Sequence, residues 1–363
     1  HYGYPNVNVG ILNVEEYKDH DDPLKWSREG FEIPKIVDLR SSLINARYSL
    51  SVKSPGMAPP SGFSSRFLDI TKEISISQKP ADVELSLVKK PTFKLNFGGR
   101  AAPHGPNVSV KTAKLGGNTK VNWRLEKAAS DTELKAAEAV TSLFRKGVDE
   151  HALTRAFSMG NFGLGRRRVL VPTRWSITAV DDTAGKAMIT EVKRFQEGDC
   201  VAYFGGHLGN YYLIILFDDV WQYELYEQFV PQERRKASSQ IVAEHDYESY
   251  TGRKDYAHET AGGYYATRLG ILEKLHEMKR QASVLVIRII TEEYLAPLGV
   301  WVVREAVRKA LATRPLRFGD RKLMLEYAKK MMQQLFAYDI DALLHKSEVV
   351  KNLTSQQKLK KFL

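Results

Sequence analysis

The stretch CVAYFGGHLGNYYLIILFDDVWQYELYEQFV, residues 200–230, decides the fold class of this chain. It contains three apolar runs of strand length, CVAYFGG, NYYLIILF and WQYELYEQFV, separated by short turns rich in glycine and aspartate. Connections this short cannot form the crossovers that parallel neighbours need, so the pattern predicts antiparallel strands. In the turn GGHLGN, we expect His207 to be a structural or solvated residue.

Outside this stretch, the sequence predicts further strands and several helices. RVLVPTRWSITAVDD and AMITEVKRF are also apolar runs of strand length and are predicted to be strands. ASVLVIRII (282–290) is expected to be a central strand. Helical spacing and stop signals predict helices at 130–147, 149–160, 262–281, 300–311 and 320–336. The predicted fold class is therefore α+β, with a central, mostly antiparallel sheet, flanking helices and a flexible C-terminal tail.

Composition shifts predict three parts along the chain. Residues 1–65 mix Pro, Gly and Ser with short apolar runs, and are expected to be an irregular N-terminal segment packed on the body. Residues 66–345 are the expected α+β core domain. Residues 346–363 hold five lysines and a single acid, which predicts a mobile basic tail.

Charge and cysteine content restrict the class of protein. A net charge of +11 favours polyanionic partners, with nucleic acid ahead of membrane surfaces, and the apolar runs are too short to span a bilayer. Cys200 is alone, which excludes an intrachain disulfide and a cysteine-based zinc site within this sequence and fits a reducing, cytoplasmic setting. We expect Cys200 to be a buried, inert thiol.

The C-terminal QQKLKKFL, residues 356–363, has the spacing of a docking peptide. Gln356, Leu359 and Phe362 are three residues apart, so a 3₁₀ turn aligns them on one face, with Leu363 beside Phe362. This pattern resembles the PCNA-interacting peptide (PIP box), which binds the replication sliding clamp. The alternative interpretation is a last amphipathic turn folded onto the body.

TRWSITAVDD is the first candidate site. On a strand, Arg174, Ser176 and Thr178 share one face, where the guanidinium and two hydroxyls would hold a phosphate. Asp181 and Asp182 follow at the expected strand end, where they would bind a divalent metal or act as a base. The alternative is a strand-end turn with solvated acids.

Two glycine-rich segments are further candidates. FGGRAAPHGP (97–106) offers Arg100 and His104 on a backbone that can approach a ligand, or it is an ordinary connector. AGGYYATR places Gly262 and Gly263 before a long helix, where backbone N–H groups suit a phosphate and Tyr264 could stack on a base. The alternative is that the glycines cap the helix and the tyrosines lie in the core.

Several long segments together resemble the archaeal Nre proteins: VPTRWSITAVDD, FGGRAAPHGP, GGHLGN, TGRKDYAHETAGGYYATRLGILE and PLGVWVVREAVRKAL. The resemblance runs from YGYPNVNVG to the last residue. It implies a DNA-repair role and a terminal PIP box. Members of this family typically carry an N-terminal, cysteine-containing zinc module, which the printed sequence lacks, so no zinc is assigned to it.

We therefore expect an archaeal DNA-repair factor, cytoplasmic and associated with the nucleoid, that docks on PCNA and acts on DNA or a nucleotide. If it is an enzyme, it is expected to be a hydrolase or phosphodiesterase, with a bound nucleotide or divalent metal as the open cofactor choices. The alternative is a non-catalytic DNA-binding adaptor without a nucleotide pocket. Convergence of the three candidate segments on one pocket would favour the enzyme.

Overall fold

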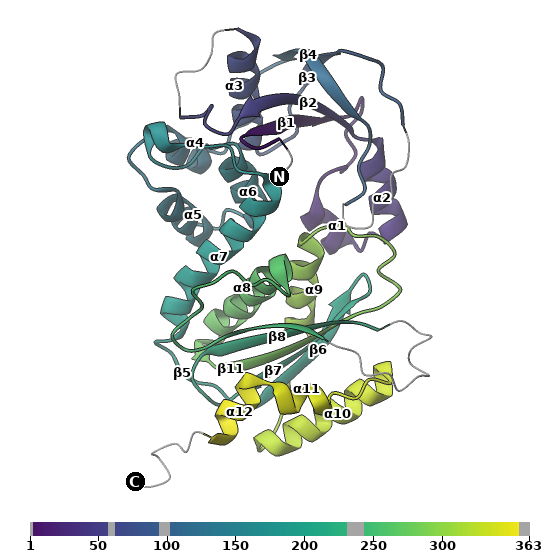
Figure 1. The fold of residues 1–363 in the computed structure, drawn as a ribbon, viewed down its shortest axis with the longest axis vertical. Coiled ribbons are helices and arrows are strands. Elements are labelled where there is room, and N and C mark those ends of the chain that lie inside the picture. The colour runs from purple at the N-terminus through teal and green to yellow at the C-terminus, as the bar shows by residue number, and fades with distance from the viewer. Residues whose placement is uncertain (1–2, 57–61, 94–101, 231–242, 356–363) are drawn as a thin grey trace. The chain divides into compact units, whose positions relative to one another are not determined.

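A computed structural model describes residues 3–56, 62–93, 102–230 and 243–355 (Figure 1). The chain divides into two compact units. The N-terminal unit comprises His1–Ala184 with Ala296–Leu298, and the C-terminal unit comprises Gly185–Leu295 with Gly299–Leu363. The boundary lies within helix α7 (Thr173–Val192), so the sequence expected to be one core domain over 66–345 is shared between two units.

The C-terminal unit is built on a sheet with the order β12-β6-β7-β11-β8-β9 among the described residues. Its strands are β6 (Val201–His207), β7 (Asn210–Phe217), β8 (Gln222–Phe229), β9 (Glu244–Glu248), β11 (Ser283–Ile290) and the short β12 (Leu316–Arg317). All neighbours are antiparallel except β8 and β11. The predicted α+β class with a mostly antiparallel sheet is confirmed.

Strand β11 lies between β7 and β8, although these two are joined directly in the chain. Ser283 is in register with Phe217 on one side and Gln222 on the other. The run SVLVIRII is apolar almost throughout, which suits a strand that is buried on both faces. The prediction that 282–290 is central is confirmed, and its insertion separates two strands that are sequence neighbours.

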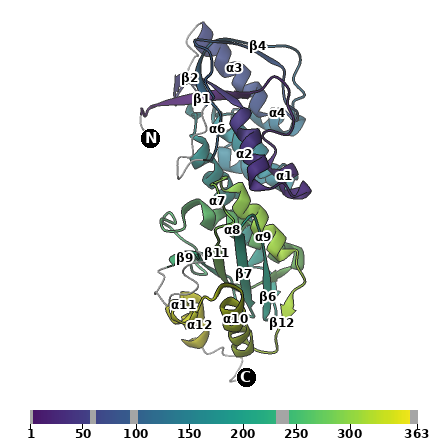
Figure 2. The same cartoon turned by 90° about the vertical axis from the view of Figure 1, so that its right-hand side faces the viewer.

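Helices cover both faces of this sheet (Figures 1 and 2). One core joins α8 (Ala261–Met278) and α9 (Trp301–Leu311) to the sheet through residues such as Leu272, Val307 and Ile214. The other core joins α10 (Arg321–Phe336), α11 (Asp341–Lys346) and α12 (Glu348–Ser355) to the opposite face through Met324, Leu343 and Ile287. A parallel pair of short strands, β5 (Gln196–Glu197) and β10 (Arg280–Gln281), lies beside the main sheet.

The N-terminal unit has a smaller sheet, of order β1-β2-β4-β3 among the described residues. Its strands are β1 (Asn6–Asn13), β2 (Ile44–Ser51), β3 (Val83–Leu87) and β4 (Asn107–Leu115). Helix α3 (Phe63–Ser75) packs Phe67 and Leu68 on one face of it, and α1 (Pro23–Glu29) and α2 (Ile33–Ser42) connect β1 to β2. The expectation of an irregular segment at 1–65 is wrong, because these elements are regular.

A helical cluster completes the N-terminal unit. It contains α4 (Trp123–Ser130), α5 (Ala136–Arg145), α6 (Glu150–Ser158) and the 3₁₀ turn η1 (Gly165–Arg167). Leu125, Val140 and Leu153 form the centre of its core. Within the described residues, no helix is long and apolar enough to cross a membrane.

Helix α7 replaces the strands expected over 168–195. Ser176, Val180 and Ala184 are all fully buried and recur every four residues, which is the spacing of one helical face. Pro172 directly precedes the helix, where its missing N–H costs nothing. The β-branched residues of RWSITAV imitate a strand pattern, but the buried set follows the helical period.

Candidate functional sites

The segment TRWSITAVDD occupies the first half of α7, and this changes where its side chains point. Successive helical residues are turned by about 100°, so Arg174, Ser176 and Thr178 do not share a face. Arg174 is exposed, whereas Ser176 is buried and its hydroxyl donates to the carbonyl oxygens of Val171 (3.2 Å) and Pro172 (3.3 Å). The prediction of one phosphate-binding face on a strand is therefore wrong.

Asp181 and Asp182 lie inside α7 and not at a strand end. Asp181 is buried and Asp182 is partly exposed, as expected for neighbours that point about 100° apart on a helix. Among the described residues, no group of three or more His, Cys, Asp or Glu side chains is placed to hold a metal ion. A catalytic role for this pair stays a prediction.

The segment FGGRAAPHGP is described only from residue 102, so Arg100 lies outside the described residues. A Cβ at Gly105 would overlap the backbone carbonyls of Ser41 and Leu43, and its N–H donates to the Arg40 carbonyl at 3.2 Å. The glycine thus lets this connecting segment pack against the end of α2. His104 is half-buried, with Nδ1 2.7 Å from the Gly105 carbonyl oxygen.

The start of α8 is already supplied with negative charge by the protein itself. The backbone N–H and hydroxyl of Thr260 donate to Asp246 Oδ2 at 2.8 and 2.9 Å. A Cβ at Gly263 would overlap the carboxylate of Glu227, which accepts from Arg288 at 2.6 Å. Carboxylates paired with Arg253 and Arg288 therefore already lie beside the segment where a phosphate was expected at Gly262 and Gly263.

Tyr264 belongs to the core of the C-terminal unit. Its ring is fully buried against Tyr223, and its hydroxyl donates to Glu248 at 3.3 Å. The same carboxylate accepts from Arg268 at 2.6 Å. Burial raises the pKa of Tyr264 well above its ordinary value. Stacking of this ring on a base, as expected from sequence, would require it to leave the core.

A buried carboxylate in β8 holds the start of α12. Glu224 is fully buried, and its oxygens accept from the hydroxyl of Ser347 (2.5 Å) and from the backbone N–H groups of Glu348 (3.1 Å) and Val349 (3.1 Å). These N–H groups have no partner within the helix, and a negative charge at a helix start is favourable. Glu224 therefore caps α12 from another element.

Further contacts fasten α12 along its length. The side-chain amide of Asn352 donates to Gln222 Oε1 and to the hydroxyl of Tyr247, both at 3.0 Å. Arg321 donates to the carbonyl oxygen of Leu353 at 3.4 Å. The prediction of a mobile tail from residue 346 is wrong for Glu348–Ser355, which is a packed helix. The peptide Gln356, Leu359, Phe362 and Leu363 follows it and lies outside the described residues.

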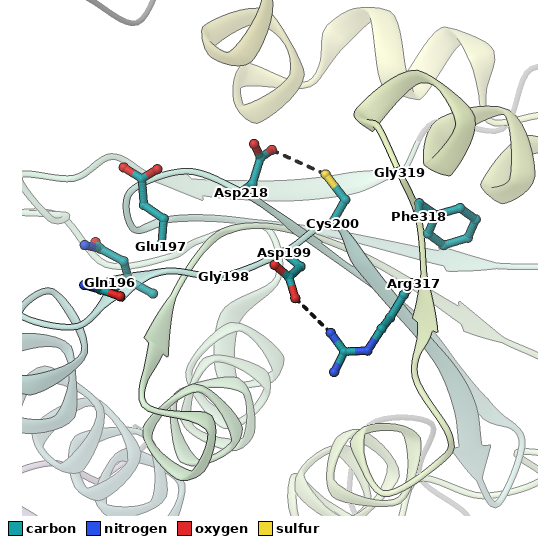
Figure 3. A pocket seen from close by; sticks show the side chains of 10 residues that line it. Gln196, Glu197, Gly198, Asp199, Cys200, Asp218, Arg317, Phe318 and Gly319 are labelled. Atoms are coloured by element: carbon teal, nitrogen blue, oxygen red, sulfur yellow. Dashed lines mark hydrogen bonds and ion pairs between the residues drawn. The ribbon is translucent and has the colours of Figure 1, made fainter. Parts of the chain in front are cut away.

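A polar hollow in the C-terminal unit is lined by Glu197, Asp199, Cys200, Asp218, Arg317 and Phe318, among others (Figure 3). Asp199 pairs with Arg317 at 2.9 Å, and the Cys200 thiol donates to Asp218 at 3.3 Å. Three carboxylates in its wall disfavour an anionic ligand. Of the residues predicted to bind phosphate, those that the structure describes do not line it. Cys200 is buried, as expected, and burial raises the pKa of its thiol; that it is inert stays a prediction.

Two family models match this chain. A family model described as archaeal Nre, N-terminal, matches residues 1–234, and one described as archaeal Nre, C-terminal, matches residues 248–362. The chain belongs to the archaeal Nre family. No solved structure matches this Nre chain.

Sequence matches to three relatives cover most of the Nre chain. DNA repair protein NreA of Haloferax volcanii is 36% identical over 318 residues, covering 85% of this chain and 74% of that protein. DNA repair protein NreB of Archaeoglobus fulgidus is 31% identical over 354 residues, covering 96% and 86%. NreA of the same organism is 34% identical over 317 residues, covering 86% and 77%. These relatives support a role for the Nre chain in archaeal DNA repair.

Sequence reasoning missed Glu224 and its partners in α12. One signal was present: YELYE places an acid among apolar residues in a strand that is buried on both faces, and such an acid needs a partner. The partner itself, more than 120 residues later, could not be read from the pattern.

Proposed function

We propose that this Nre chain is a DNA-repair factor that docks on the PCNA sliding clamp through Gln356, Leu359, Phe362 and Leu363. The observation that supports this most is the anchoring of α12, which is held by Glu224 at its start and by Asn352 and Leu353 near its end. The docking peptide begins at the residue after this helix. The residue spacing of the peptide matches the family's hook, and the family relation comes from the matches along the whole chain.

Anchoring affects how the tether works. A peptide attached directly to a fixed helix has few free residues between body and clamp, so the body is held close to the DNA that threads the ring. The lysines at 358, 360 and 361 favour encounter with an acidic partner. Ordering of the peptide on binding costs entropy, which keeps the contact reversible.

For the body, we propose DNA binding without nucleotide turnover. Three findings support the adaptor over the enzyme: the α7 residues point to different sides, carboxylates occupy the start of α8, and Tyr264 is in the core. Cytoplasmic placement near the nucleoid follows from this role and is part of the proposal.

Truncation separates the hook from the fold. Removal of residues 356–363 should abolish clamp binding in calorimetry and leave the melting temperature unchanged, whereas truncation at residue 346 should also lower the melting temperature, because it removes α12. Phe362→Ala should cost about 2 kcal/mol, roughly thirtyfold in Kd, as expected for an aromatic anchor. Unchanged clamp affinity after removal of 356–363 would overturn the docking proposal.

A thermal-shift screen tests the role of the body. Nucleotides and short DNAs are added to the full chain with and without Mg²⁺. We expect stabilisation by DNA and none by mononucleotides. A nucleotide-induced rise that Arg174→Ala removes would favour the enzyme instead.

A further inference from the structure

The sheet of the N-terminal unit has one apolar and one polar face. Val9, Ala46 and Val110 point to α3 and are buried. Because side chains alternate along a strand, their neighbours point the other way. This polar sheet face is defined by Asn8, Asn45, Arg47, Ser49, Ser109 and Lys111.

Register brings these residues together across three strands. Asn8 lies opposite Ser49 in the β1–β2 pair, and Arg47 lies opposite Gly10 in the same pair and opposite Ser109 in the β2–β4 pair. Asn8, Ser49, Ser109 and Lys111 are exposed, and Arg47 is partly buried. The face is therefore a surface of amides and hydroxyls around one guanidinium.

Gly10 makes room for the Asn45 side chain, which lies next to Arg47 in β2. A Cβ at Gly10 would overlap Oδ1 of Asn45 and would stand 3.5 Å from Cγ of Arg47. The absence of a side chain at Gly10 thus lets Asn45 lie across β1, with Arg47 in ordinary contact beside it.

Arg47 carries a charge that the described part of the protein does not neutralise. Its Nε is buried and has no hydrogen-bond partner there, and no described carboxylate forms an ion pair with it. Burial lowers the pKa of Arg47, but a guanidinium remains protonated at any physiological pH. The side chain is only partly buried, so its positive charge stays available to an anion at this face.

Alternation places a second cation on the face, because Lys111 is exposed and follows the buried Val110 in β4. Ser86 is in register with Thr112 and Leu87 with Val110, so Lys111 is the extra residue of β4. Within β1, β2, β3 and β4, which are fully described, Glu84 is the outward-facing acid. It lies in β3, at the edge of the sheet away from β1, and is in register with Lys114.

We infer that the polar sheet face binds the sugar–phosphate backbone of DNA. The argument rests on the proposed role in DNA repair and specifies the surface that performs it. Arg47 and Lys111 match phosphate charge, and the Asn and Ser groups supply the neutral hydrogen bonds that position a backbone. The outward residues of these strands include no aromatic ring, so the face does not stack bases. Contact is with the backbone and independent of sequence.

Fluorescence anisotropy with a labelled duplex and a labelled single strand tests this surface. Arg47→Ala and Lys111→Glu should each weaken binding about tenfold and equally across DNA sequences. Each should also reduce the slope of log K against log salt by about 1, because one phosphate contact is lost. Lys111 is exposed, so its replacement leaves the core untouched. Lys330→Glu on α10 makes the same charge change in the other unit and should leave affinity within about twofold.

The outcomes separate this inference from the proposed function. If both variants bind DNA with wild-type affinity and salt slope, the face is not the DNA surface, while DNA binding by the wild type stands. If they lose clamp affinity and keep DNA affinity, the face binds a protein and the inference is overturned. Absence of DNA binding by the wild-type chain would sink both the inference and the DNA-binding part of the proposal, leaving clamp docking to its own truncation test.

Discussion

At the scale of single residues, Glu224 shows how the fold uses a buried charge. A carboxylate without water is stable only when hydrogen bonds replace its hydration. Ser347 and the first N–H groups of α12 provide these bonds, and the hydroxyl of Tyr226 adds another at 3.0 Å. The same bonds fix the helix that precedes residues 356–363, the proposed docking peptide.

Glu224→Ala should lower the free energy of unfolding by about 2–4 kcal/mol, because it leaves buried donors without an acceptor. Chemical denaturation measures the change, and amide exchange should rise most in Glu348–Ser355. Glu348→Ala is the matched control, since it removes a half-exposed acid paired with Lys351 and should cost under about 1 kcal/mol. Equal effects of the two variants would contradict the anchoring role.

His207 has an environment that disfavours its charged form. Burial and then Lys309, whose Nζ is 3.1 Å from Nδ1, lower its pKa from 6.5 to about 4. His207 begins the tight β6–β7 turn, where Leu208 and Gly209 have φ of +51° and +73°. The expected structural role of this residue is consistent with its place.

Proton NMR should give His207 a pKa near 4, and Lys309→Met should raise it by removing a neighbouring positive charge. Between about pH 4 and 6.5 the unfolded chain binds a proton that the folded chain does not. This contribution to stability is therefore present above pH 6.5 and is lost as the pH falls to about 4. Lys322→Met, on the exposed side of α10, should leave the titration unchanged; a wild-type pKa of 6.5 would contradict the environment described.

At the scale of elements, the connection that ends at β4 depends on close backbone contact. Gly105 meets the carbonyls at the end of α2, and Asn45 donates its N–H to the Pro106 carbonyl at 2.9 Å. The chain thus joins β2 and β4 as parallel neighbours. A side chain at residue 105 has no room without a backbone shift.

Gly105→Ala should destabilise the N-terminal unit by about 2 kcal/mol or more, because the added methyl group forces the backbone apart. Gly117→Ala makes the same change where no atom lies within 4 Å, and should be neutral or slightly stabilising. Thermal denaturation of both variants measures the difference. Similar melting temperatures for the two would show that the connection yields without strain.

At the scale of the whole molecule, the two units have separate cores. Phe67 is buried with Val9 and Leu50 in the N-terminal unit, while Leu213 is buried with Ile287 and Met332 in the C-terminal unit. Loss of packing in one core should be felt first within that core, since cores are close-packed and transmit changes over short distances.

Phe67→Ala should lower the free energy of unfolding by about 3–5 kcal/mol, and Leu213→Ala should lower it by about 2–5 kcal/mol. Both losses come from lost burial and from the cavity left behind. Hydrogen exchange with mass spectrometry should place the larger increase in the unit that carries each substitution. Uniform acceleration across both units for either variant would mean that they unfold as one body.

Prediction from sequence succeeded where a pattern was local and unambiguous. NYYLIILF and ASVLVIRII read as strands because apolar residues fill them, and the helix 262–281 follows from leucines at helical spacing. It failed at TRWSITAVDD, where β-branched residues fit both periods and burial chose the helix. The predicted common face of Arg174, Ser176 and Thr178 is wrong for the same reason, since a two-residue step changes face on a helix.

The sequence by itself determined the α+β class, a central strand, the family and the spacing of the terminal peptide, because each is carried by residues close together in the chain. Only the tertiary structure decided that β11 separates β7 from β8, that Glu224 caps α12, and that Arg47 lies over Gly10 on a polar face. These features join residues distant in sequence, and which distant groups meet depends on how buried surfaces and hydrogen bonds are satisfied together.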